Sequence, residues 1–198
     1  SNLDQYMEGV SAVVSCLGNR RPFHDDCVAN LGTQGIVQAV LRQEVTPRFV
    51  MLSSVGIAED WPPMEWSREG QRLQGFFRTI CWMQYQDLSG AELATQQGAQ
   101  TNKEFNFLIV RSVILDETTI PVGGWYVQVA KHKDHPPCLD LAKMDCARFM
   151  VEEAITPSVR RRAVVLGGVP APVPVPVPLT TTDPQKNKKR KQQHQESE

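Results

Sequence analysis

The chain has 198 residues with a formal net charge of −1 at pH 7, and 41% of its residues are hydrophobic. This balance excludes a largely disordered body, a membrane-spanning protein and a strongly basic nucleic-acid binder. We predict one domain over residues 1–168, within the usual range of about 100 to 200 residues, followed by a disordered tail over residues 169–198.

The body alternates short apolar strands with helices. Residues 11–15 form a short run rich in β-branched residues, typical of a buried strand, and residues 30–43 have the apolar spacing of a helix. Residues 49–52 predict the second strand. The next predicted elements are a helical region over 65–98 with a break near Ser89 and Gly90, a strand over 105–110, a helix over 141–155 and a strand over 162–166. Strands separated by helices predict an α/β fold with a mainly parallel sheet.

Small residues follow the first two predicted strands. Cys16, Leu17 and Gly18 come after the first, and Ser53 and Ser54 come after the second. In open α/β sheets, ligands bind outside the carboxyl ends of the strands, and small residues let a ligand approach the backbone closely. These positions are therefore candidate ligand contacts.

Four segments, residues 12–18, 50–56, 106–112 and 145–151, resemble those of the atypical short-chain dehydrogenases. This NAD(P)-binding family includes flavin and biliverdin reductases and NmrA-like proteins. The resemblance spans most of residues 1–168 and implies a Rossmann-like, mainly parallel sheet with flanking helices. It also implies an NADP or NAD cofactor and an NAD(P)H-dependent reductase with a small planar or carbonyl acceptor. The alternative is a non-catalytic protein, either an NmrA-like nucleotide sensor or a truncated product that binds little.

The resemblance implies that eight residues contact the dinucleotide, with Ser54 as the active-site hydroxyl. The set is Cys16, Leu17, Gly18, Ser53, Ser54, Arg111, Ser112 and Val113. The first three would lie beside the ribose and pyrophosphate, and the last three would form the turn at the nicotinamide end. Hydride transfer needs two rings held in register and water excluded, so backbone and hydroxyl contacts are sufficient.

Several family features are missing from these residues. No G-x-G-x-x-G loop occurs, so the N-terminal strands and the glycine-rich βαβ unit that hold the pyrophosphate are expected to be absent. Leu88 stands at the expected lysine position, Tyr85 is followed by Ser89 rather than by a lysine, and Ser112 stands where relatives commonly have proline. Proton transfer by a tyrosine–lysine pair is therefore not predicted.

The missing strands have a structural consequence at the first strand of this chain. Residues 12–14 would form an exposed apolar edge, whose N–H and C=O groups lack partners. We expect the isolated chain to be poorly stable, or to obtain a neighbouring strand from an upstream segment or by self-association with another copy.

Other suggestive residues have plainer interpretations. His132 and His135 have H-x-x-H spacing but no third ligand candidate on a regular element, so we predict no metal site. Asp145 is interpreted as a helix-face or capping carboxylate rather than a catalytic one. The aromatic residues Phe76, Phe77 and Trp82 predict a core or subunit contact.

The tail and the cysteines bear on localisation. Proline alternates strictly over residues 169–178, which favours an extended polyproline II rod. The basic run at 186–191 has two interpretations: a signal for nuclear import or nucleic-acid binding, or a solvated, disordered end. The five cysteines form no C-x-x-C pair, which favours a reduced, intracellular protein over a disulfide framework. We expect a cytoplasmic or nuclear location, and a targeting signal upstream of residue 1 is compatible with this sequence.

Overall fold

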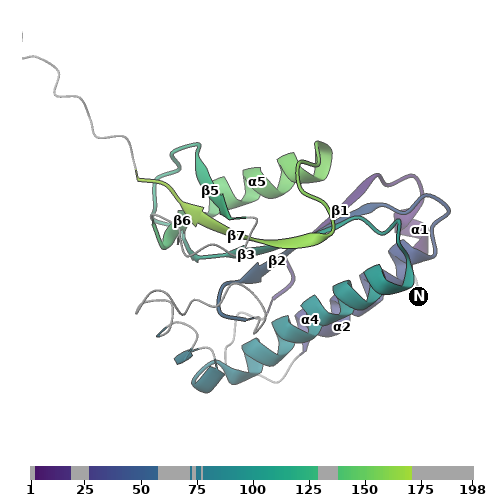
Figure 1. Ribbon diagram of the computed structural model, residues 1–198, viewed down its shortest axis with the longest axis horizontal. Helices are drawn as coiled ribbons and strands as arrows, with labels where there is room; N and C mark the ends of the chain where they lie inside the picture. The colour runs from purple at the N-terminus through teal and green to yellow at the C-terminus, as the bar shows by residue number, and fades with distance from the viewer. Residues whose placement is uncertain are drawn as a thin grey trace, which may run out of the picture.

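The computed structural model describes residues 3–18, 27–57, 72, 75–76, 78–128 and 138–170. Within these residues a central sheet is covered by helices on both faces (Figure 1). The short α1 (Asp4–Met7) precedes β1, and α2 (Val28–Leu41) and α4 (Trp82–Thr101) lie against one face of the sheet. On the other face lies α5 (Lys143–Ile155). No described helix combines the length and hydropathy needed to cross a membrane.

The main sheet has five strands in the order β1-β2-β3-β7-β5. The strands are β1 (Ala12–Ser15), β2 (Arg48–Ser54), β3 (Phe107–Ser112), β7 (Arg162–Gly168) and β5 (Trp125–Gln128). The first four are parallel and β5 is antiparallel to β7, which confirms the predicted α/β fold with a mainly parallel sheet. Within the described residues β1 pairs with β2 alone, so the predicted sheet edge at residues 12–14 is confirmed.

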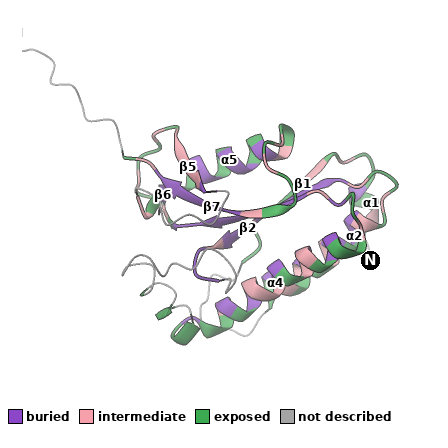
Figure 2. Cartoon of the chain, viewed as in Figure 1, coloured by how far each residue is buried: buried purple, intermediate pink, exposed green. Residues whose placement is uncertain are grey.

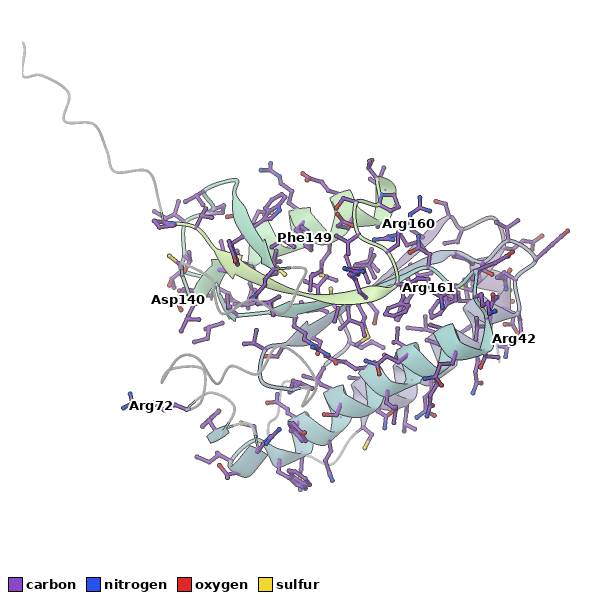
Figure 3. The ribbon with its side chains drawn as sticks, in the orientation of Figure 1. Arg42, Arg72, Asp140, Phe149, Arg160 and Arg161 are labelled. Carbon is purple, nitrogen blue, oxygen red and sulfur yellow. The ribbon has the colours of Figure 1, made fainter. Side chains whose placement is uncertain are left out.

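Alternate residues of the strands build one core on each face of the sheet. Figure 2 shows that the central strands are buried along most of their length. Phe49 and Met51 of β2 pack with α2 and α4, whereas Val50 packs with α5, where Figure 3 shows Phe149. Both cores are continuous runs of apolar side chains across β2 and β3, as a parallel sheet covered on both faces requires.

Helices α2 and α4 pack closely because two glycines of α4 face α2. A Cβ atom on Gly90 would lie 2.4 Å from the Asn30 side chain, and one on Gly98 would lie 2.6 Å from Val37. The predicted break near Ser89 and Gly90 is wrong, since α4 is continuous from Trp82 to Thr101. Gly90 is needed for helix contact, not for a change of chain direction.

Three other predictions need correction. Phe76 and Trp82 are exposed, so their assignment to the core is wrong, because the sheet-facing side of α4 is built instead from residues such as Tyr85, Ala91 and Thr95. The third strand begins at residue 107 rather than 105. Three short strands were not predicted. One is β5, and the other two, β4 (Ile114–Asp116) and β6 (Asp140–Ala142), form a separate parallel pair. Leu73, Phe77, His132, His135 and residues 171–198 lie outside the described residues.

Buried polar contacts fix the amino ends of the strands. The guanidinium of Arg48, the first residue of β2, lies 3.0 Å from a carboxylate oxygen of Glu153 on α5, and both side chains are buried. Nearby, Arg161 adopts a left-handed backbone conformation and donates from Nη2 to the Ala99 carbonyl at 2.7 Å. Figure 3 places Arg161 beside the C-terminal end of α4, whose carbonyls it caps.

Candidate functional site

The carboxyl ends of the parallel strands meet at one edge of the sheet. Ser54 and Ser112 are paired residues at the ends of β2 and β3, and the pair is held by hydrogen bonds from the Val55 amide to the Ser112 carbonyl and from the Ser112 hydroxyl to the Ser53 carbonyl. The adjacent Val113 amide donates to Leu166 at the end of β7. Three neighbouring strands therefore end in one hydrogen-bonded layer.

A pocket of about 460 Å³ opens at this layer. Its described lining comes from the ends of β2 and β3, from β4 and from the first half of α4. The lining residues are Ser54, Phe76, Gln84, Leu88, Ser112, Val113, Ile114 and Leu115. The pocket thus brings together three of the predicted site residues, Ser54, Ser112 and Val113, in a mostly apolar lining whose polar residues are two serines and one glutamine.

Two other predicted residues, Ser53 and Arg111, direct their side chains into the protein instead. Both contact Glu92 of α4, and all three side chains are buried. Arg111 Nη2 lies 2.7 Å from Glu92 Oε2, and the Ser53 hydroxyl donates to Glu92 Oε1 at 2.5 Å. Ser53 and Arg111 can therefore offer only backbone groups to a ligand at this edge.

Cys16, Leu17 and Gly18 follow β1 at the same edge of the sheet but do not line the pocket. The Leu17 side chain lies against α2, where a Cβ atom on Gly32 would be 2.4 Å from it.

Burial raises the pKa of the Cys16 thiol, and burial together with the nearby Cys16 raises the pKa of Cys146 to about 12. Both thiols are thus poor nucleophiles at neutral pH.

The N-terminus of α2, which also lies beyond the sheet edge, is filled by the protein itself. The Asp87 carboxylate on α4 accepts hydrogen bonds from the Ala29 amide at 3.0 Å and the Asn30 amide at 2.7 Å. These amides are the groups that would bind a phosphate at a helix N-terminus. The N-terminus of α2 therefore does not offer these two amides to a phosphate.

Sequence reasoning missed the roles of Asp87 and Glu92, although a signal was present. Glu92 stands at helical spacing with small inward-facing residues such as Thr95 and Ala99, so a carboxylate on that stripe must be buried and paired.

Asp145 is also buried and accepts hydrogen bonds from the Val122 and Gly123 amides. It fixes the loop before β5, in agreement with a structural rather than a catalytic interpretation.

The parallel sheet and its flanking helices define an α/β fold of the Rossmann type. No protein-family model matches the sequence, and no curated protein sequence matches it either. Solved structures, in contrast, show the fold clearly.

Three of these structures illustrate the similarity. A short-chain dehydrogenase/reductase from Veillonella parvula, solved in complex with NADP, has a TM-score of 0.59 and 12% identity over 85% of this chain and 68% of its own. The oxidoreductase ylbE from Lactococcus lactis has a TM-score of 0.60 and 16% identity over 85% of this chain and 66% of its own. A candidate NADH-flavin reductase from Streptococcus pneumoniae has a TM-score of 0.56 and 12% identity over 82% of this chain and 74% of its own. This chain therefore shares the fold of these three proteins over 66% to 74% of their length.

Proposed function

We propose that this protein is an NAD(P)H-dependent reductase of the flavin-reductase type. The observation that carries the proposal is the pocket at the carboxyl edge, where Ser54 and Ser112 stand in register on adjacent strands. Both hydroxyls donate to backbone carbonyls, which leaves their oxygens able to accept hydrogen bonds from a ligand. Neighbours of the same fold include an NADP complex and a candidate NADH-flavin reductase, which supports this choice of cofactor and acceptor.

The pocket chemistry favours a conjugated ring as acceptor over an isolated ketone. A reduced nicotinamide, when bound, would supply a hydride, and a ketone that accepts it becomes an alkoxide, which must receive a proton from a neighbouring group. The described lining residues contain no acidic or basic side chain, and Leu88 stands where a lysine would be expected. A flavin-like ring delocalises the charge that it gains, so it needs no proton from a neighbouring side chain. Phe76, Leu88 and Val113, which line the pocket, would provide the apolar surface that such a ring requires.

A second function, nucleotide sensing without catalysis, is favoured by a different observation. The Asp87 carboxylate occupies the α2 N-terminus, so dinucleotide binding depends on the nicotinamide end of the site. A protein built this way would bind a dinucleotide weakly and could report its concentration without turning it over.

Titration of the protein with NADPH and with NADH, followed by fluorescence, tests the shared requirement for binding. Ser54→Ala and Ser112→Ala should each weaken binding about three- to tenfold, as expected for the loss of one hydrogen bond. Thr101→Ala, which removes an exposed hydroxyl at the far end of α4, is the matched control and should bind as the parent does.

Consumption of NAD(P)H in the presence of a free flavin or a quinone then separates the two functions. Turnover that is slowed by both serine variants supports the reductase, whereas binding without turnover supports the sensor. If neither NADPH nor NADH binds, both the reductase and the sensor function are refuted.

A further inference from the structure

We propose that Glu92 is a positioning residue for the pocket at the carboxyl edge, a role that rests on the proposed dinucleotide function of that pocket. Glu92 does not line the pocket. It acts through Ser53 and Arg111, each of which directly precedes a pocket residue in the chain.

The Glu92 carboxylate joins two strands to one helix. Oε1 accepts hydrogen bonds from the Ser53 hydroxyl at 2.5 Å and from Arg111 Nε at 3.1 Å, and Oε2 accepts from Arg111 Nη2 at 2.7 Å. Ser53 and Arg111 are themselves paired across β2 and β3. One side chain of α4 thus fixes the spacing of both strands immediately before they end.

The next pair on these strands is Ser54 and Ser112, so the contacts of Glu92 determine where both pocket hydroxyls lie. The same side chain also fixes the helical wall. Leu88 and Gln84 precede Glu92 by one and two helical turns and line the pocket from α4. The Glu92 carboxylate therefore connects the ends of β2 and β3 to α4, and all three elements line the pocket.

Burial makes this arrangement sensitive to the charge of Glu92. Arg111 and Glu92 are both almost wholly removed from solvent, so losing the charge of one leaves the other in a medium that stabilises it poorly. Glu92→Gln would keep one acceptor oxygen but remove the charge, so it should weaken the hydrogen bonds by which Ser53 and Arg111 hold the strand ends.

The chain offers a matched control in Arg48 and Glu153. This second buried ion pair also joins a helix to β2, but at the opposite end of the strand. Glu153→Gln should lower stability at least as much as Glu92→Gln, because Glu153 also accepts hydrogen bonds from the Ser158 and Val159 amides. It should leave the pocket unaffected.

The test compares Glu92→Gln and Glu153→Gln with the parent, at a temperature below all three unfolding transitions. Amide hydrogen exchange measured by mass spectrometry reports on residues 52–57 and 110–115, which include the Val55 and Val113 amides. NADPH titration reports on binding. We expect Glu92→Gln to accelerate exchange in both segments and to weaken NADPH binding about tenfold. Glu153→Gln should leave both readouts within about twofold of the parent.

Ser53→Ala keeps the Glu92–Arg111 ion pair and removes only one hydrogen bond, so it provides a measurement if Glu92→Gln fails to fold. It should accelerate exchange in the same two segments to a smaller extent. Equal effects of Glu92→Gln and Glu153→Gln on both readouts would show that Glu92 is merely a stabilising residue, and so would unchanged exchange in Ser53→Ala. If the parent does not bind NADPH, the proposed function fails, and the exchange comparison alone decides whether Glu92 positions the strand ends.

Discussion

Removal of the Asp87 carboxylate should destabilise the protein more than removal of most surface carboxylates. Asp87 is buried and accepts hydrogen bonds from two amides in the first turn of α2. Hydrogen bonds to charged groups contribute about 1.5 to 3 kcal/mol each, and a carboxylate near a helix N-terminus adds about 0.3 to 1 kcal/mol. Since water can reach the Asn30 amide more easily than the buried Ala29 amide, we expect Asp87→Ala to cost about 3 kcal/mol.

Urea denaturation followed by circular dichroism provides the measurement. Asp87→Asn keeps an acceptor but loses the charge, so it should cost about half as much as Asp87→Ala. Asp116→Ala is the control, because Asp116 also accepts several hydrogen bonds, from Thr118 and Thr119, but lies at the end of β4 and is not buried. The control should scarcely change the denaturation midpoint. A midpoint for Asp87→Ala equal to that of Asp116→Ala would refute the reasoning.

Two further predictions concern pH and self-association. Because the folded state keeps the Cys146 proton up to a pKa of about 12 while an ordinary thiol loses it near 9.0, the stability that this group contributes is complete below pH 9 and decreases as the pH rises towards 12. The urea midpoint of the parent should therefore fall more steeply above pH 9 than that of Cys146→Ala, and identical slopes would contradict this. At the sheet edge, Val14→Lys should reduce concentration-dependent association in sedimentation velocity, because a lysine on an edge strand opposes pairing with another chain. Val45→Lys, on an exposed loop, is its control, and equal association of both variants with the parent would show that the edge does not mediate contact.

The order of the main elements could be predicted because it depends on local patterns. The strands β1, β2 and β3 are short apolar runs, each separated from the next by a helix, and small residues follow the apolar runs of β1 and β2. The edge position of β1 followed from the strand order of the family that the chain resembles, together with the absence of the glycine-rich βαβ unit. In contrast, β4 and β6 have three residues each, and their pairing depends on segments far apart in the chain.

The pocket was predictable only in part. Ser54 and Ser112 could be selected because residues at parallel strand ends lie at a common edge. The direction of the Ser53 and Arg111 side chains could not be, because it depends on Glu92, a residue of α4 that is distant in sequence from both strands. The role of Asp87 likewise depends on how α2 and α4 pack, and the sequence shows that packing only as two glycines in a helix.

Those glycines also constrain how the protein can change over evolution. At positions 90 and 98 the Cβ atom of any larger residue would collide with the side chain of Asn30 or Val37, so either that side chain must move or α2 must shift away from α4. That displacement would withdraw the α2 amides from Asp87, although neither glycine touches that carboxylate. Homologous chains that retain this helix pair should therefore keep glycine at both positions even where the pocket residues diverge with the choice of acceptor.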